Sequence, residues 1–150
     1  MEVRRGVGVR WRTATLLCAA VGCASSNGPS GPLSPSSRPY LADIPLPEGF
    51  TLADRSSEDW SARTIRFVRH RYLGRGDRQA ARAFYRRQMP LVRWTPICES
   101  SANGRHELSF RRAKETCRIT IDGRGRGPRN ALIIEALIAP DPGGAGSSGS

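Results

Sequence analysis

Alternating apolar and polar residues dominate the second half of the chain. In residues 117–122 every second side chain is apolar, and in residues 106–112 the two large apolar side chains share one face. This period predicts strands with one buried face. Residues 131–139 are apolar on both faces apart from Glu135, so we expect this strand to lie in the middle of a sheet. The Asn-Gly step at 103–104 is typical of a hairpin turn.

A helical period comes before these strands. Residues 78–89 bring apolar side chains to one side at intervals of three and four residues, which predicts an amphipathic helix. Asp77 is a favourable N-cap for this helix, and we expect Pro90 to end it. The apolar face consists of Ala81, Phe84, Tyr85 and Gln88 or Met89.

Two further strands complete the expected fold. Residues 62–74 are rich in β-branched and aromatic side chains, and residues 91–98 follow the helix with Pro96 marking an edge or a bend. The order strand, helix, then four strands predicts an α+β two-layer sandwich, with one helix on a mostly antiparallel sheet of about five strands. The remaining core candidates are Trp94 and, in an extended cap at residues 40–52, Leu46 and Phe50.

Both ends of the chain have compositions that do not support a core. Residues 24–39 and 140–150 consist mainly of Ser, Pro and Gly. We therefore expect a flexible linker at 23–39 and a disordered tail at 140–150. The single folded domain is expected at residues 40–139.

The N-terminus has the pattern of an exported protein. Residues 1–12 contain four arginines and one glutamate, and residues 13–22 are apolar or small, as in a signal peptide. The apolar stretch is too short to span a bilayer, which takes ~20 residues. Ala20-Val21-Gly22-Cys23 then resembles the lipobox of bacterial lipoproteins, with Ala20 where leucine is usual.

This resemblance implies a signal peptide at residues 1–22 and Cys23 as the first residue of the mature chain, acylated on its sulfur. Acyl chains on Cys23 would hold the protein to a membrane of the cell envelope, facing the periplasm or the exterior. One alternative is an ordinary signal peptide cleaved near Ala24, which gives a soluble secreted protein. The other is a chain that is not exported.

A second resemblance covers most of the folded part. It rests on residues 43–50 (DIPLPEGF), 69–72 (RHRY), 84–90 (FYRRQMP), Trp94 and 115–121 (ETCRITI). In these segments the chain resembles a family of uncharacterised bacterial envelope lipoproteins, best represented in planctomycete-like genomes. The resemblance implies a small α+β domain in the cell envelope, and the family has no assigned activity.

Cys98 and Cys117 would remain after processing and are a candidate disulfide. An oxidising compartment favours a bridge. The expected strand order, however, places the two residues two strands apart, at about 9.5 Å, whereas a disulfide needs Cα atoms within about 7 Å. A disulfide and a pair of buried thiols both stay open at this point.

The sequence contains no motif that predicts catalysis or a metal site. The two histidines, His70 and His106, have no Cys or His partner at metal-ligand spacing. There is no G-x-S-x-G motif. We expect the acidic pair Glu58 and Asp59 in a solvated loop, no enzymatic activity and no cofactor.

The net charge of +11 is almost entirely arginine, because only Lys114 of the 24 basic residues is a lysine. Ten arginines and one acid fall within residues 63–93. In the expected helix, Arg78, Arg82 and Arg86 recur at every fourth residue. Like charges at this spacing repel, and no glutamate on the helix offsets them; an external anion or an acid elsewhere in the fold can do so.

These three helix arginines, together with Arg69 and Arg71, are candidates for binding an anionic surface, either membrane lipid or an envelope polymer. A rival function is that of a basic cytosolic protein that binds nucleic acid through residues 63–93. The export pattern favours the membrane and no nucleic acid, and the sequence does not predict an oligomeric state. The alternative to anion binding is a solvated basic face neutralised in part by Glu99, Glu107 or Glu115.

Overall fold

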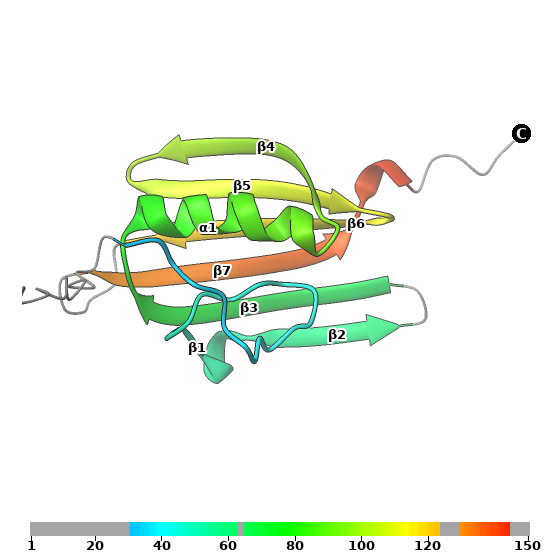
Figure 1. Cartoon of the computed structure of the whole chain (residues 1–150). Coiled ribbons are helices and arrows are strands. Elements are labelled where there is room, and N and C mark those ends of the chain that lie inside the picture. Colours follow the sequence, from blue (N-terminus) through cyan, green and yellow to red (C-terminus); the bar gives the residue numbers. More distant parts are fainter. Residues whose placement is uncertain (1–30, 63–64, 124–129, 145–150) are drawn as a thin grey trace, which may run out of the picture.

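The described part of the chain folds into one α-helix and one sheet of seven strands (Figure 1). A computed structural model describes residues 31–62, 65–123 and 130–144. The elements in chain order are β1 (Thr51–Leu52), the 3-10 turn η1 (Asp54–Ser56), β2 (Glu58–Ala62), β3 (Ile65–Arg75), α1 (Arg78–Leu91), β4 (Thr95–Ala102), β5 (Arg105–Arg112), β6 (Glu115–Asp122), β7 (Ala131–Pro140) and the 3-10 turn η2 (Pro142–Gly144).

The sheet is antiparallel, in the order β1-β3-β7-β6-β5-β4, and β2 pairs with the first half of β3. The predicted α+β class, with one helix against a mostly antiparallel sheet, is confirmed. The sheet has two strands more than expected because the short β1 and β2 both pair with β3. β7 lies between β3 and β6, as its two apolar faces predict.

The helix has the predicted start and buried face. The side chain of Asp77 accepts a hydrogen bond from the backbone N–H of Ala80 at 3.0 Å, which satisfies one of the free N–H groups at the helix start. Pro90 does not end the helix, which continues to Leu91. The chain then turns through Arg93, whose φ is +68°. The helix buries Ala81, Phe84, Tyr85 and Met89.

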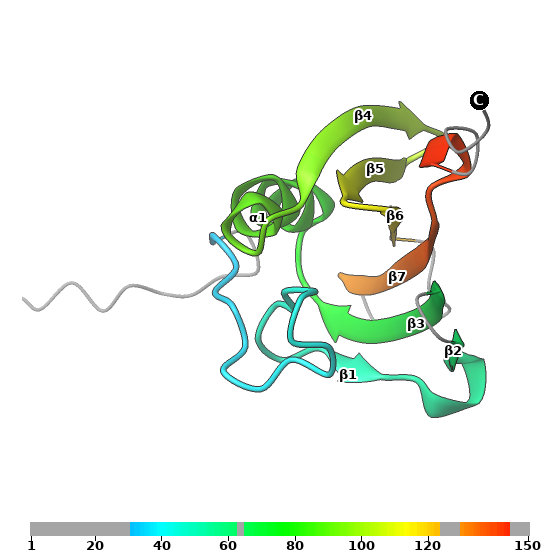
Figure 2. The same ribbon diagram turned by 90° about the vertical axis from the view of Figure 1, so that its right-hand side faces the viewer.

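The helix and an N-terminal arm, residues 31–50, cover the same face of the sheet (Figure 2). The arm buries Ile44, Leu46 and Phe50, which confirms the expected cap. Phe50 lies close to Gly74: a Cβ added to Gly74 would come within 2.4 Å of the Phe50 ring. The opposite face of the sheet carries no α-helix in the described part of the chain; we call it the open face.

Several boundaries differ from the sequence predictions. The arm contacts the domain before residue 40, because Leu33 packs on the core and the N–H of Ser36 donates to the carbonyl of Leu46 at 2.8 Å. Residues 58 and 59 are not in a loop but in strand β2. The strand expected at 91–98 begins at Thr95, because the helix and its final turn extend to residue 94. Trp94 is buried in the core, as expected.

Candidate functional site

The predicted arginine row lies along the side of α1 that faces β4. The guanidinium of Arg78 donates to the carbonyl of Gly104 in the β4–β5 turn. Arg82 forms an ion pair with Glu99 of β4, and Nε of Arg86 lies 3.9 Å from the second oxygen of the same carboxylate. Of the three acids weighed as partners, Glu99 is therefore the one that meets this row.

Arg69 and Arg71 lie on a different surface. Side chains alternate along β3, and Val68, His70 and Tyr72 point to the covered face, so the two arginines point to the open face. Nε of Arg69 lies 3.7 Å from a carboxylate oxygen of Glu135. The five candidate arginines are thus divided between the two faces of the sheet.

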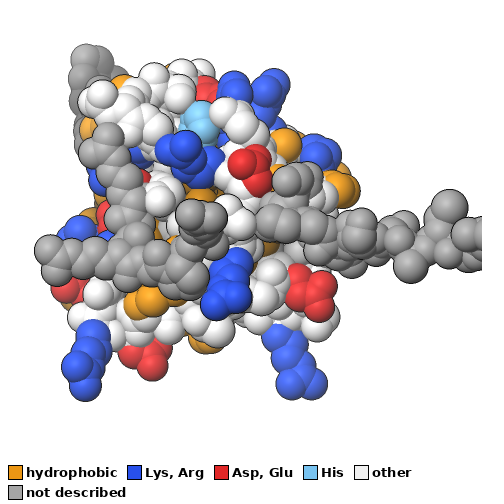
Figure 3. All heavy atoms as spheres, turned by 90° about the vertical axis from the view of Figure 1, so that its left-hand side faces the viewer, with side chains coloured by type: hydrophobic (Ala, Val, Ile, Leu, Met, Phe, Trp, Pro, Cys, Tyr) orange, Lys and Arg blue, Asp and Glu red, His pale blue; other side chains and the backbone are white. Residues whose placement is uncertain are grey.

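Acidic and basic side chains also alternate elsewhere on the surface. Figure 3 shows the end of the molecule at which α1 begins, where Lys and Arg side chains are interspersed with Asp and Glu. On the open face, Arg118 pairs with Glu107 at 3.3 Å and Arg111 with Asp141 at 2.8 Å. Arg111 and Arg118 are therefore neutralised by acids on the same face.

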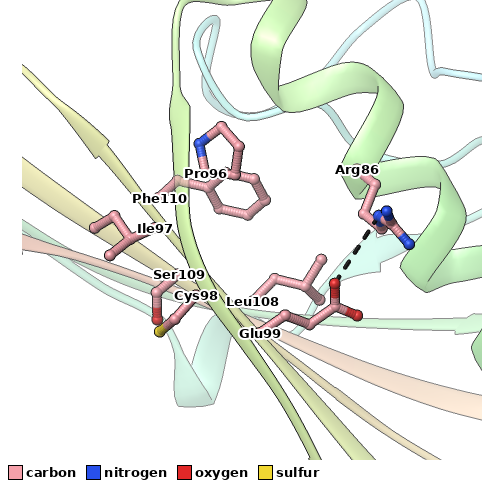
Figure 4. A pocket seen from close by; sticks show the side chains of 8 residues that line it. All are labelled: Arg86, Pro96, Ile97, Cys98, Glu99, Leu108, Ser109 and Phe110. Atoms are coloured by element: carbon pink, nitrogen blue, oxygen red, sulfur yellow. Dashed lines mark ion pairs between the residues drawn. The ribbon is translucent and has the colours of Figure 1, made fainter.

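A groove of about 320 Å³ lies between α1 and β4 (Figure 4). Leu108 and Phe110 of β5 provide apolar walls, and Arg86 reaches from the helix toward Glu99 at the rim. The side chain of Arg86 is 61% exposed. At 3.9 Å its contact with Glu99 is longer than a hydrogen bond, so the guanidinium can accept a second anion.

The C-terminal half of α1 is the least neutralised basic surface of the helix. The helix contains no acidic residue. Arg87 is exposed and has no ion pair with any described residue. Leu91, the most exposed large hydrophobic residue in the described ranges at 73%, lies one turn beyond Arg87. Arg86, Arg87 and Leu91 are hereafter called the helix tip.

A half-buried network of two arginines and two acids joins the arm to the sheet. Arg66 of β3 donates to both carboxylate oxygens of Asp43, at 2.7 and 3.3 Å, and to Glu115 of β6 at 3.2 Å. Arg112 of β5 contacts the same two acids. Its guanidinium carbon lies 4.4 Å from the ring centre of Trp94, whose indole N–H donates to the carbonyl of Asp43 at 2.8 Å.

The network fixes the charge of its members. Burial raises the pKa of Asp43, but hydrogen bonds from Arg66 and then Arg112 lower it by more, so that it lies below its ordinary value. The hydrogen bond to Asp43 raises the pKa of Arg66. Both shifts keep Asp43 and Arg66 ionised at neutral pH, and the network pairs two basic with two acidic side chains. This arrangement is suited to holding the arm in place rather than to binding a further ion.

A second polar chain links β2 to the core. The ring of the buried His70 lies between Tyr72 and Asp59, with Nδ1 2.9 Å from the Tyr72 hydroxyl and Nε2 2.7 Å from a carboxylate oxygen of Asp59. A carboxylate only accepts, so Nε2–H donates to Asp59; in the neutral ring with this tautomer, Nδ1 accepts from the Tyr72 hydroxyl. Burial, with the charge of Asp59, raises the pKa of Tyr72, which keeps its hydroxyl protonated.

The candidate disulfide residues, Cys98 and Cys117, are free thiols. Cys98 of β4 and Cys117 of β6 are separated by β5, which is the strand order that argued against a disulfide. Cys117 is buried, and burial raises its pKa to about 12. Cys98 is exposed rather than buried, because β4 is an edge strand.

Four predicted features lie wholly or partly outside the described residues: the signal peptide at 1–22, lipidation at Cys23, residues 24–30 of the linker and residues 145–150 of the tail. Within the described ranges, no group of three or more Cys, His, Asp or Glu side chains is placed to hold a metal. No helix in these ranges is long and apolar enough to cross a membrane. The chain matches no protein-family model, no curated protein and no solved structure.

Proposed function

We propose that the protein is a lipid-anchored protein of the bacterial cell envelope, whose small α+β domain has a binding or structural role and no catalytic activity. The observation that carries the proposal is the N-terminal pattern. A basic segment, ten apolar or small residues and a lipobox-like Ala20-Val21-Gly22-Cys23 follow one another in order. An acylated Cys23 would carry at least two chains, and two chains hold a protein stably to a membrane, whereas one does not.

The tether would keep the domain close to the bilayer. Seven residues separate Cys23 from Gly31, where the described part begins. A flexible chain of this length spans about 15 Å. Surface side chains of the domain would therefore meet lipid headgroups frequently, and a basic surface would be held against an anionic membrane.

The helix tip is the surface best suited to that contact. Arg78 and Arg82 are held by the β4–β5 turn and by Glu99, so Arg86 and Arg87 have the guanidinium groups that remain available. Each arginine close to an anionic membrane contributes ~1 kcal/mol of binding. The exposed Leu91 beside them adds an apolar side chain that can enter the interface.

The anchor is tested by fractionating host cells that express the wild type, Cys23→Ala or Cys18→Ala. Cys18 is the matched control, because it would leave with the signal peptide. We expect the wild type and Cys18→Ala in the membrane pellet and Cys23→Ala as an unprocessed or released chain. A full-length wild type in the cytosol would contradict the proposal and favour the nucleic-acid-binding function.

The helix tip is tested separately with vesicles of phosphatidylcholine, with or without phosphatidylglycerol, and a full chain in which Cys23 is replaced by serine. Arg86→Gln with Arg87→Gln should weaken binding to the anionic vesicles by about 30-fold, since two arginines contribute ~2 kcal/mol. Arg111→Gln with Arg118→Gln removes the same charge from the open face. Equal losses in the two double variants would show that only net charge matters.

A further inference from the structure

The two long edges of the sheet differ in how they are protected. β4 contains Pro96 and a register irregularity between Pro96 and Cys98. Such features block the addition of another strand. β2 at the other edge has no proline, and its register with β3 is continuous. No described strand other than β3 pairs with β2, and all five of its residues are exposed.

The middle residue of β2 is a large exposed aromatic. Trp60 is 58% exposed and pairs with Phe67 of β3. Phe67 shares the open face with Arg69, so the indole of Trp60 lies on that face as well. Ile65, the first residue of β3, is 47% exposed and belongs to the same face by alternation. An apolar cluster of Trp60, Ile65 and Phe67 thus lies next to a strand edge that contains neither a proline nor a bulge.

The strand is held in position from the covered face. Asp59 precedes Trp60 and points to the other side of the sheet, where its carboxylate accepts from the buried His70 at 2.7 Å. The backbone of β2 is therefore fixed by a side chain as well as by its pairing with β3. An edge that is already ordered loses less conformational freedom when a second strand pairs with it.

We propose that β2 is a self-association edge, at which two copies of this chain pair antiparallel about a two-fold axis through Trp60. Glu58–Ala62 is five residues long, so Trp60 is its centre and would lie opposite Trp60 of the second copy. Glu58 would then lie opposite Ala62, and Asp59 opposite Ser61. Acids of one copy never face acids of the other, so the edge is complementary to itself, as an isologous interface requires.

The size of the contact predicts a weak dimer. Complete burial of a Trp side chain removes about 150–250 Å² from water, and the paired strands add only five residues each. The total lies below the ~1,200 Å² of standard interfaces. Association should therefore depend on concentration. The proposal does not require a lipid anchor, although confinement to a membrane would raise the effective concentration of the chain.

Disulfide trapping tests the proposed register between the two β2 strands without a substitution at Trp60. The full chain is used with Cys18, Cys23 and Cys98 replaced by serine, and it carries either Glu58→Cys or Ala62→Cys. Residues 58 and 62 face each other only across the proposed two-fold axis, so a mixture of the two variants should form disulfide-linked dimers several-fold faster than either variant alone. Equal rates in the mixture and in the separate variants would overturn the proposal.

Sedimentation of the full chain with Cys18, Cys23 and Cys98 replaced by serine, and without an introduced cysteine, tests the role of Trp60. Trp60→Lys sets two ammonium groups opposite each other and should leave a monomer at concentrations where the parent dimerises. Leu91→Lys is the matched control, because it adds the same charge at a more exposed leucine outside the edge, and it should dimerise as the parent does. A parent that is monomeric at all concentrations, or equal dimerisation of both variants, would contradict the proposal. Neither experiment depends on acylation of Cys23.

Discussion

Replacing Asp43 by asparagine should destabilise the domain strongly, although the substitution changes neither size nor shape. The carboxylate is shared by Arg66 and Arg112. In Asp43→Asn both guanidinium groups are left with only Glu115. Removing one partner of a fully buried pair costs about 3–5 kcal/mol, and breaking an exposed pair costs about 0.2–1 kcal/mol.

The expected loss lies between these limits. The side chains of Asp43, Glu115, Arg66 and Arg112 are 20–28% exposed, so solvent screens them partly. We therefore expect a loss of about 2 kcal/mol in the free energy of unfolding, or about 8 °C in Tm for a domain of this size. The variant Glu107→Gln is the control. It breaks the exposed pair with Arg118 and should cost less than ~1 kcal/mol.

The pH dependence has a definite sign. The pKa of Asp43 in the folded protein is lower than its ordinary value of 3.8. Its stabilising effect is therefore present above that value and is lost as the pH falls through the folded pKa. Urea unfolding at pH 7 and at pH 3 should show a smaller difference between the two pH values for Asp43→Asn than for the wild type. A variant as stable as Glu107→Gln at pH 7 would refute this reasoning.

Three further predictions concern the core and the groove. Tyr85→Phe should leave stability unchanged or raise it by ~1 kcal/mol, because the buried Tyr85 hydroxyl has no hydrogen-bond partner among the described residues. Tyr72→Phe breaks the contact with His70 and should lower stability; urea unfolding of both variants tests this, and equal losses would contradict it. In the folded full chain with Cys18 and Cys23 replaced by serine, a thiol reagent should modify Cys98 quickly and Cys117 only after unfolding, since burial raises the Cys117 pKa to about 12; rapid reaction of both thiols would be the contrary result. Glu99→Gln releases Arg82 and Arg86 and should tighten binding to phosphatidylglycerol vesicles by about fivefold, or ~1 kcal/mol, in a co-sedimentation assay. Unchanged binding would show that Arg82 and Arg86 do not contact lipid.

Local patterns predicted the elements whose buried face is visible in the sequence. The alternation in residues 117–122 and 131–139 predicted β6 and the central β7. β2 was not predicted, because Glu58–Ala62 has no alternation of apolar residues. Its conformation depends on its pairing with β3, in which Trp60 lies opposite Phe67 and Asp59 contacts His70.

The polar sites depend more on the tertiary structure than on local sequence. The helical spacing correctly placed Arg78, Arg82 and Arg86 on one side of α1, but the choice of Glu99 as their partner depends on where β4 runs. The alternation of side chains along β3 places Arg69 on the open face, away from this row. In the network, Asp43 contacts Arg66 and Arg112, which lie 23 and 69 positions further along the chain, and no spacing rule in the sequence signals contacts over such separations.

Fatty-acid labelling in the native host tests the central claim most directly. Cells that express the wild type, Cys18→Ala or Cys23→Ala are grown with a labelled fatty acid, and the protein is isolated and sized. We expect label on the wild type and on Cys18→Ala, with the mobility of a chain that has lost residues 1–22, and no label on Cys23→Ala. A wild type that carries no label, or a Cys23→Ala variant that is labelled as the wild type is, would contradict the account.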